Sequence, residues 1–201
     1  MTGLPLVMAI TGASGAPYAV RLLEQLLVAV QPVQLILSSH GLRLLQTETA
    51  LTSEADLRTA VGSARWDALV TSFDDADRGA APASGSSRNR GMVICPCSMG
   101  TMSAISQGTS RSLVERAADV ALKERRTLVL VPRETPYSVI HLENMLRLTR
   151  AGAVVLPASP GFYHRPASVA EMVDFVVARV LDHLGIDHAL GKRWGESPDD
   201  A

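Results

Sequence analysis

The sequence lacks the features that mark membrane, secreted and nucleic-acid-binding proteins. Its apolar runs have the length of a strand, far short of the roughly 20 residues that cross a bilayer. The first residues lack the basic, apolar and small-residue pattern of a secretory signal, so we expect a cytoplasmic protein. The net charge is −1 and no basic tract is present, so we expect no nucleic-acid partner.

Signatures of several catalytic classes are also missing. The histidines lack the helical spacing of a metal-binding pair, and no G-x-S-x-G elbow or Cys–His pattern indicates a hydrolase. The aspartates of residues 74–77 have no second acidic cluster elsewhere, so we predict no metal site. The only cysteines, Cys95 and Cys97, should point to the same face of one strand. A disulfide there would strain the backbone, so we interpret both as buried thiols.

With 201 residues, 47% of them hydrophobic, the chain fits one domain with one core. We assign residues 4–186 to the core and residues 187–201 to a carboxyl-terminal tail. Apolar runs typical of strands alternate with helical patterns. The expected strands are residues 4–10, 33–39, 67–73, 91–98, 127–134 and 153–159, and the expected helices are residues 18–30, 41–50, 99–108, 114–126 and 138–150. This alternation predicts an α/β fold: a doubly wound, mainly parallel sheet with helices on both faces.

A last helix has clear start and stop signals. Ser168 and Glu171 have the spacing of a capping box, and Gly185 marks the end. One apolar stripe joins Val169, Val173, Val176, Val177, Val180 and Leu184. Arg179 lies at the edge of this stripe, where a full charge needs a partner, either a carboxylate of the chain or a bound phosphate.

Two turns rich in small residues follow expected strands. TGASGAPY at residues 11–18 and CSMGT at residues 97–101 each combine glycine with a serine hydroxyl at a helix start. Amide groups at such a start attract an anion, so a phosphate is a natural ligand, although a merely tight turn gives the same pattern. Ser38, at the tip of another strand, should lie beside them. Two such turns in one sheet favour a phosphorylated, nucleotide-like ligand.

Charged and aromatic residues follow the last strands. The stretch LVLVPRETP, residues 128–136, ends a strand in Arg133 and Glu134. The carboxyl ends of parallel strands border the ligand crevice in such folds, so these charges are site candidates. The loop of residues 157–166 follows the next strand at the same edge. Its Tyr163 fits either a ligand contact or a half-buried loop anchor.

Two further segments have a structural and a functional interpretation. In residues 114–126, Arg116, Asp119 and Lys123 share one helical face and fit a solvated ladder of ion pairs. Residues 74–89, rich in Gly, Ala, Ser and Pro, are too long for an idle connection. They predict a mobile lid or a ligand-contacting segment.

Eight segments together resemble the UbiX-type flavin prenyltransferases. They are TGASGAPY, PASGSS, MVICPCSMGT, ERAADVALKERR, LVLVPRETP, HLENM, PGFYHRP and RWG, in family order. The resemblance implies a flavodoxin-like or Rossmann-like three-layer sandwich, related to cysteine decarboxylases, with one flavin prenyltransferase domain over residues 1–201. Such an enzyme joins the dimethylallyl group of dimethylallyl phosphate to N5 and C6 of reduced FMN. The product, prenylated FMN, would serve a separate UbiD-type decarboxylase.

The same resemblance implies the site residues. FMN contacts fall on Gly12, Ala13, Ser14, Ser38, Ser98, Met99, Gly100, Thr101 and Arg133. The prenyl-phosphate site falls on Lys123, Glu134, Tyr163 and Arg179, with Arg116 and Glu48 nearby and Trp194 as an aromatic wall. Family members form dodecamers with shared sites, so Arg116 and Lys123 could reach a ligand in a second copy of the chain.

The implied chemistry needs no metal, because Lys123, Tyr163 and Arg179 would stabilise the departing phosphate. Glu134, Ser14 or the released phosphate would take the ring-closing proton, and the sequence does not rank them.

Two positions depart from the family pattern. Ser39 stands where many relatives have Lys, and Arg78 where some have Trp. A flavin-dependent cysteine decarboxylase, acting on a peptide or on phosphopantothenoylcysteine, is the alternative enzyme, but no His aligns at residues 15–17 and no Cys follows Cys97. A non-catalytic FMN carrier would need the FMN turns but not the prenyl-phosphate residues.

Overall fold

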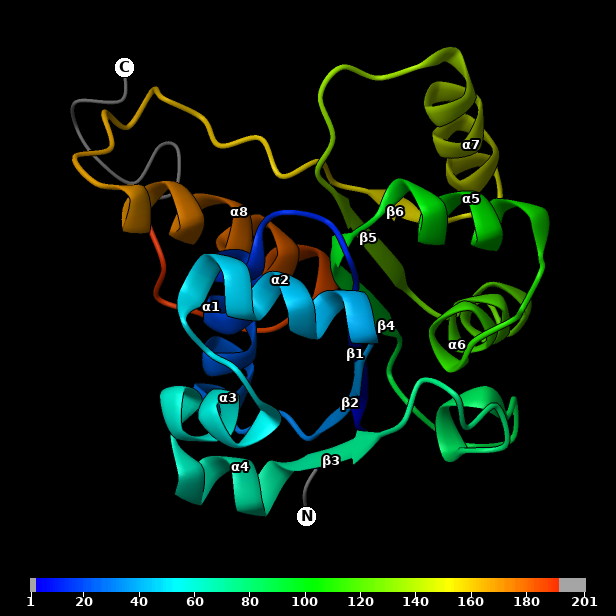
Figure 1. The fold of residues 1–201 in the computed structure, drawn as a ribbon, viewed down its shortest axis with the longest axis horizontal. Coiled ribbons are helices and arrows are strands. Elements are labelled where there is room, and N and C mark those ends of the chain that lie inside the picture. The colour runs from blue at the N-terminus through cyan, green and yellow to red at the C-terminus, as the bar shows by residue number, and fades with distance from the viewer. Residues whose placement is uncertain (1–2, 192–201) are drawn as a thin grey trace.

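The computed structural model describes residues 3–191, which form one six-stranded parallel sheet (Figure 1). The strands are β1 (Leu6–Ile10), β2 (Val33–Leu37), β3 (Val70–Phe73), β4 (Met92–Cys97), β5 (Leu128–Pro132) and β6 (Val154–Val155). Their order across the sheet is β3-β2-β1-β4-β5-β6. The predicted doubly wound, flavodoxin-like α/β fold is confirmed. Connections leave β1 and β4 toward opposite faces, and a ligand crevice is expected at the carboxyl ends of such neighbours.

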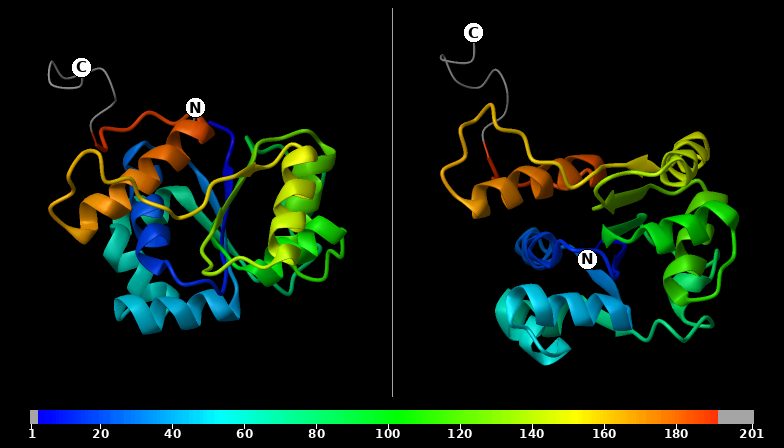
Figure 2. Two further views of the ribbon diagram at one scale, coloured as in Figure 1. Left: turned by 90° about the horizontal axis from the view of Figure 1, so that it is seen from above. Right: turned by 45° about the horizontal axis from the view of Figure 1, so that its top comes forward.

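Helices cover both faces of the sheet (Figure 2). They are α1 (Ala16–Val28), α2 (Ser39–Thr49), α3 (Glu54–Val61), α4 (Ser63–Leu69), α5 (Met99–Gln107), α6 (Leu113–Lys123), α7 (Val139–Arg150) and α8 (Val169–Leu184). One core lies between the sheet and α1 and α8, and a second lies between the sheet and α5, α6 and α7. Within residues 3–191, no helix has the length and apolar character needed to cross a membrane.

Helices α3 and α4 are not predicted by the sequence pattern. The strand expected at residues 67–73 begins only at Val70, because residues 67–69 complete α4. Trp66 explains the difference: its side chain is 7% exposed and packs α4 into the core of α1 and α8. The last strand is also shorter than expected, since β6 spans only Val154–Val155.

The closing helix α8 has the predicted ends. Ser168 Oγ accepts the Glu171 amide at 3.2 Å, although the Glu171 carboxylate bonds the amide of Ala167 and not that of Ser168. Gly185 ends the helix in the left-handed conformation. The apolar stripe is buried except for Val169, which is 73% exposed. Val169, the first residue of α8, belongs to neither core.

Residues 74–89 replace a crossover helix between β3 and β4. The carbonyl and carboxylate of Asp75 accept the first two amides of α6, at 2.7 and 2.9 Å. At the other end of α6, the Arg126 guanidinium donates to two carbonyls of residues 85–87. The segment therefore runs along α6 and is anchored to both ends of that helix, and its role as a lid or as a ligand-contacting segment stays a prediction.

Cys95 and Cys97 both lie in β4 but pack in different cores. Cys95 contributes to the core of α1 and α8, and Cys97 to the core of α5, α6 and α7. The prediction that they share a face is wrong, because the pairing of β4 with β5 shifts register between Ile94 and Cys97. Their predicted burial is confirmed at 1% and 0% exposure. Burial raises the pKa of both thiols, that of Cys97 to about 12.

The carboxylate of Glu48, in α2, accepts hydrogen bonds from amides at the start of α1. Glu48 Oε2 accepts the amides of Gly15 and Ala16, both at 2.8 Å. Burial acts to raise the pKa of Glu48, but hydrogen bonds from the Ser14 hydroxyl and these two amides, together with the Arg133 charge, lower it overall. The anion at this helix start is therefore supplied by the chain itself.

We expect both thiols to resist alkylation in the folded protein. A raised pKa keeps each thiol protonated, and the protonated form is a poor nucleophile. With a thiol-reactive maleimide at mildly alkaline pH, mass spectrometry should detect no label on the native protein and labels on both cysteines after unfolding in guanidinium chloride. Rapid labelling of either cysteine in the native protein would contradict their burial.

Replacing Glu48 by Gln should destabilise the protein by about 1 kcal/mol at neutral pH, because a neutral amide is a weaker acceptor at a helix start. The folded-state pKa of Glu48 is lowered. Its contribution is therefore present above the unfolded-state pKa and is lost as pH falls through the folded-state pKa. Denaturant unfolding at a series of pH values should show the wild-type advantage shrinking on acidification. A difference that stays constant into the acid range would refute this role.

Candidate functional site

The carboxyl ends of four neighbouring strands carry the side chains predicted to contact FMN. Gly12, Ala13 and Ser14 follow β1, Ser38 follows β2, Ser98, Met99, Gly100 and Thr101 follow β4, and Arg133 follows β5. These strands lie in the order β2-β1-β4-β5, so the predicted residues line one edge of the sheet. The fold thus gathers, within one chain, residues that the sequence spreads over more than a hundred positions.

Two helices begin at this edge with a serine cap. Ser38 Oγ accepts the Gly41 amide at 3.0 Å at the start of α2, and Ser98 Oγ accepts the Thr101 amide at 3.1 Å at the start of α5. A helix start has amides without intrahelical partners and the positive end of the helix dipole, which suits a phosphate. Because Glu48 occupies the start of α1, the phosphate of a nucleotide would suit the starts of α2 and α5. The serine hydroxyls and free amides at these two helix starts fit the phosphate group of FMN.

A buried threonine joins the two central strands beneath these turns. Thr11 follows β1 and is 3% exposed. Its Oγ1 donates to the Pro96 carbonyl at 2.9 Å and accepts the Ser98 amide at 2.9 Å. The Ser98 turn is thereby held against the turn after β1. Sequence reasoning missed Thr11, because its partners lie far along the chain.

Two glycines allow α2 to approach β1 closely. A Cβ on Gly41 would lie 2.3 Å from the Ile10 carbonyl oxygen, and a Cβ on Gly12 would lie 2.6 Å from His40 Cβ. A side chain at Gly41 would therefore push α2, with Ser38 at its start, away from the edge. Sequence reasoning missed Gly41, although a glycine in the first turn of a helix directly after a strand is a signal of close packing.

The charges at the tip of β5 lie at the same edge, with Arg133 exposed and Glu134 half-buried. Arg133 Nε donates to the Ser14 carbonyl at 3.4 Å, and the Arg133 charge helps to stabilise the Glu48 carboxylate. Glu134 Oε1 accepts the Thr135 amide at 3.0 Å. Ser14, Glu48 and Arg133 thus form one polar cluster where β1, α2 and β5 meet.

A pocket of about 630 Å³ lies between α8 and the segments that precede and follow it. Tyr163 and Arg179, both predicted for the prenyl-phosphate site, line it together. The Tyr163 ring lies edge-on to Phe175, with centroids 5.7 Å apart, and 4.1 Å from the His164 ring. Gly161 makes room for this arrangement, since a Cβ there would lie 2.8 Å from Tyr163 Cε1.

Arg179 has a partner within the chain. Its Nη1 donates to Asp182 Oδ2 at 2.8 Å, and its side chain is 53% exposed. The charge at the edge of the apolar stripe is therefore balanced by a carboxylate, one of the two partners that the sequence allows. A guanidinium has several N–H donors, so a phosphate can still bind beside this ion pair.

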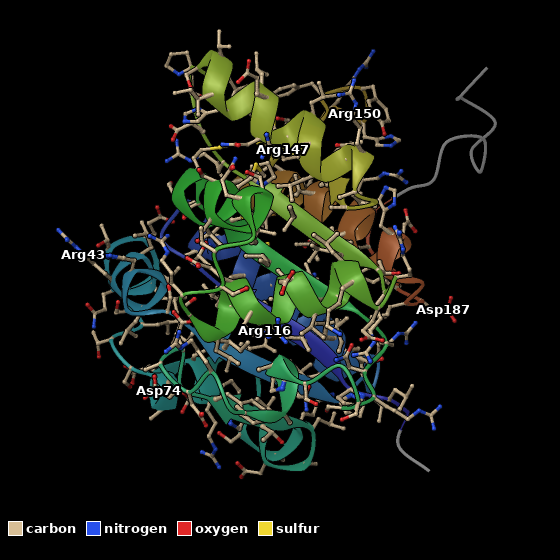
Figure 3. The ribbon with its side chains drawn as sticks, turned by 90° about the vertical axis from the view of Figure 1, so that its right-hand side faces the viewer. Arg43, Asp74, Arg116, Arg147, Arg150 and Asp187 are labelled. Atoms are coloured by element: carbon tan, nitrogen blue, oxygen red, sulfur yellow. The ribbon has the colours of Figure 1, made fainter. Side chains whose placement is uncertain are left out.

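Arg116 and Lys123 do not join these residues within one chain. Arg116 forms the predicted ion pair with Asp119 at 2.7 Å, but Lys123 pairs with Glu124 instead of extending the ladder. Figure 3 shows Arg116 in the helical layer on the opposite side of the sheet from α8. Lys123 ends α6 near the amino end of β5, whereas Glu134 follows its carboxyl end (Figure 1).

Two predictions for the prenyl-phosphate site concern residues that are not among the described residues lining the pocket of Tyr163 and Arg179. A role for Arg116 and Lys123 needs a second copy of the chain and remains a prediction. Trp194, predicted as an aromatic wall, lies outside the described residues.

Comparisons with known proteins agree with this geometry. The model of the Flavoprotein family matches residues 1–181. Flavin prenyltransferase UbiX of Pseudomonas aeruginosa is 52% identical over 198 residues, which cover 95% of this chain and 94% of that protein. The crystal structure of AnUbiX (PadA1) in complex with FMN and dimethylallyl pyrophosphate matches with a TM-score of 0.88 at 38% identity, over 96% of this chain and 98% of that chain.

A second solved structure is the dodecameric FMN-dependent UbiX-like decarboxylase from Escherichia coli O157:H7. It matches with a TM-score of 0.87 at 42% identity, over 95% of this chain and 99% of that chain. Identity at this level extends over nearly the full length of the chain. The chain therefore belongs to the UbiX flavin prenyltransferases, within the Flavoprotein family.

Proposed function

We propose that this flavin prenyltransferase transfers the dimethylallyl group of dimethylallyl phosphate to N5 and C6 of reduced FMN. The pocket shared by Tyr163 and Arg179 carries the proposal. A phenol and a guanidinium from separate segments converge there, and both are suited to phosphate oxygens. An FMN carrier without catalytic activity has no need of this pair. The AnUbiX complex with FMN and dimethylallyl pyrophosphate supports a site that holds a flavin together with a phosphorylated dimethylallyl donor.

FMN would bind along the carboxyl edge of the sheet. The hydroxyls of Ser38, Ser98 and Thr101, with the amides of their helix starts, would hold its phosphate and ribityl groups. Arg133 and Ser14, at the tips of β5 and β1, would contact the flavin ring. Ser39 is the first residue of α2, so a lysine is missing beside the phosphate where many relatives have one.

Reduced FMN supplies the electron-rich nitrogen and carbon that receive the prenyl group. The allylic C–O bond of the donor breaks when charge on the departing phosphate is stabilised. Tyr163 and Arg179 would donate hydrogen bonds to that phosphate, and no metal is needed in this proposal. Lys123 and Arg116 would reach the same phosphate from a second copy of the chain. The dodecameric Escherichia coli relative supports an assembly with shared sites.

Glu134 or Ser14 would take the ring-closing proton. Glu134 lies beside Arg133 at the tip of β5, and the Ser14 hydroxyl bonds the Glu48 carboxylate. The released phosphate is a third acceptor. Prenylated FMN would then pass to a UbiD-type decarboxylase, a recipient that follows from the family resemblance.

A cysteine decarboxylase is the weaker alternative. Such an enzyme is expected to carry a reactive cysteine late in the chain, whereas no cysteine follows Cys97 in this sequence. Cys95 and Cys97 are buried in the two cores, where burial raises the pKa of both thiols.

Incubated anaerobically with reduced FMN and dimethylallyl phosphate, the protein should yield a flavin heavier by one C5H8 unit, detected by mass spectrometry of the extracted flavin. Reactions without protein or without donor are the controls. Dimethylallyl diphosphate should react more slowly if the site is sized for one phosphate. Recovery of FMN alone from the complete reaction would overturn the proposed function.

Glu134→Gln should bind FMN with unchanged affinity but form product about 100-fold more slowly, because the amide keeps the size of the side chain and cannot take a proton. Flavin fluorescence reports the affinity and mass spectrometry the product. Glu143→Gln, an exposed change on α7, is the matched control and should behave as wild type. Normal turnover by Glu134→Gln would remove Glu134 from the mechanism and leave Ser14 or phosphate as the acceptor.

A further inference from the structure

A series of hydrogen bonds links Arg179 to Asp182 and His188, three residues that all line the pocket of Tyr163. Arg179 Nη1 donates to Asp182 Oδ2 at 2.8 Å, and Asp182 Oδ1 lies 3.2 Å from His188 Nε2. His188 Nδ1 in turn accepts the backbone amide of Leu190 at 3.1 Å. Three side chains from α8 and the segment after it are thereby joined in series.

The last of these bonds determines the tautomer of His188. A backbone amide can only donate, so Nδ1 is the acceptor and carries no proton. The proton of the neutral ring is then on Nε2, which donates to Asp182. Asp182 therefore lies between two donors, His188 and Arg179. A carboxylate can accept from both, whereas an amide of the same shape would turn its own N–H toward one of them.

The exposed fraction of the side chains decreases along this series of hydrogen bonds, from Arg179 to His188. The side chain of Arg179 is 53% exposed, that of Asp182 is 22% exposed and that of His188 is 4% exposed. The segment after α8 folds back onto the protein, with Ile186 and Leu190 buried in the core of α1 and α8. The His188 side chain is thus the buried end of the series and Arg179 its exposed end, and both line the pocket of Tyr163.

We propose that Asp182 and His188 are positioning residues that hold the Arg179 guanidinium in the orientation in which it binds the phosphate of the prenyl donor. The inference rests on the proposed function. A long arginine side chain at the surface loses conformational freedom when it binds a ligand, and an anchored ion pair removes part of that cost beforehand. The Asp182 charge by itself weakens the attraction of this pocket for an anion. Its benefit is therefore orientation, and removing the carboxylate should weaken donor binding.

The test compares Asp182→Asn, His188→Leu and the double variant in the anaerobic flavin assay. We expect the KM for dimethylallyl phosphate to rise about 10-fold in Asp182→Asn and less in His188→Leu, because misplaced binding groups lose affinity for the group they hold. The double variant should be no worse than Asp182→Asn, since both changes break one chain of bonds. His188→Gln keeps an N–H donor toward Asp182 and should stay within about twofold of wild type.

Two measurements separate positioning from a general loss of structure. The dissociation constant for FMN, read by flavin fluorescence, should be unchanged in Asp182→Asn, and the thermal unfolding midpoint should fall by no more than about 4 °C. Asp67→Asn is the matched control, because it breaks the ion pair between Arg58 of α3 and Asp67 of α4, and neither residue lines the pocket. This variant should have the wild-type KM. If His188→Leu is too unstable to assay, Asp182→Asn and His188→Gln decide the question.

The outcomes distinguish this inference from the proposed function. Wild-type product formation with an unchanged or lower KM in Asp182→Asn would overturn the positioning role and leave the function intact. A lower KM would show that Asp182 acts only by repelling the phosphate. A wild-type protein that makes no prenylated flavin would overturn the function itself, and the positioning role with it.

Discussion

The hydrogen bonds of Thr11 join the ends of β1 and β4, the two central strands among the four whose ends carry the residues predicted to contact FMN. Its hydroxyl joins β1 to the turn after β4, at the boundary where the chain leaves toward opposite faces of the sheet. α1 covers one face and α5 the other, so the two turns diverge above this link. The residues predicted to contact FMN follow these two strands or the strand next to each of them. A ring-shaped ligand suits such a crevice because backbone amides and short hydroxyls line both of its sides.

Two carboxylates bond the donors at the carboxyl edge of the sheet and at the pocket beside α8. Glu48 bonds the start of α1 and the Ser14 hydroxyl, and Asp182 bonds Arg179. Asp174 lines the same pocket as Arg179 and is paired with Arg21. Among residues 3–191, the positive charge at the pocket is therefore largely balanced by carboxylates of the same chain. A phosphate dianion would need further cations, which gives a physical reason for a site completed by a second copy.

The position of α6 fits this requirement. Residues 74–89 run along α6 and anchor both of its ends, so Arg116 and Lys123 are carried on a rigid outer helix. Lys123 lies near the amino end of β5, whereas the residues predicted to contact FMN lie at the carboxyl ends of the strands. Rigid placement at an outer surface suits residues that act on a neighbouring molecule, because the geometry of such a contact is retained before assembly.

The sequence by itself determined the order of the strands and of the described helices other than α3 and α4, the ends of α8, the burial of both thiols and the turns that carry the residues predicted to contact FMN. These features depend on local periodicity, caps and family motifs. Only the tertiary structure decided that Cys95 and Cys97 face different cores, that Trp66 turns the start of an expected strand into α4, and that Glu48 and Asp182 are the partners of a helix start and of Arg179. The first depends on a register shift, the second on packing, and the third on which of several carboxylates comes within reach. Such choices are made by contacts between elements, which local sequence patterns do not encode.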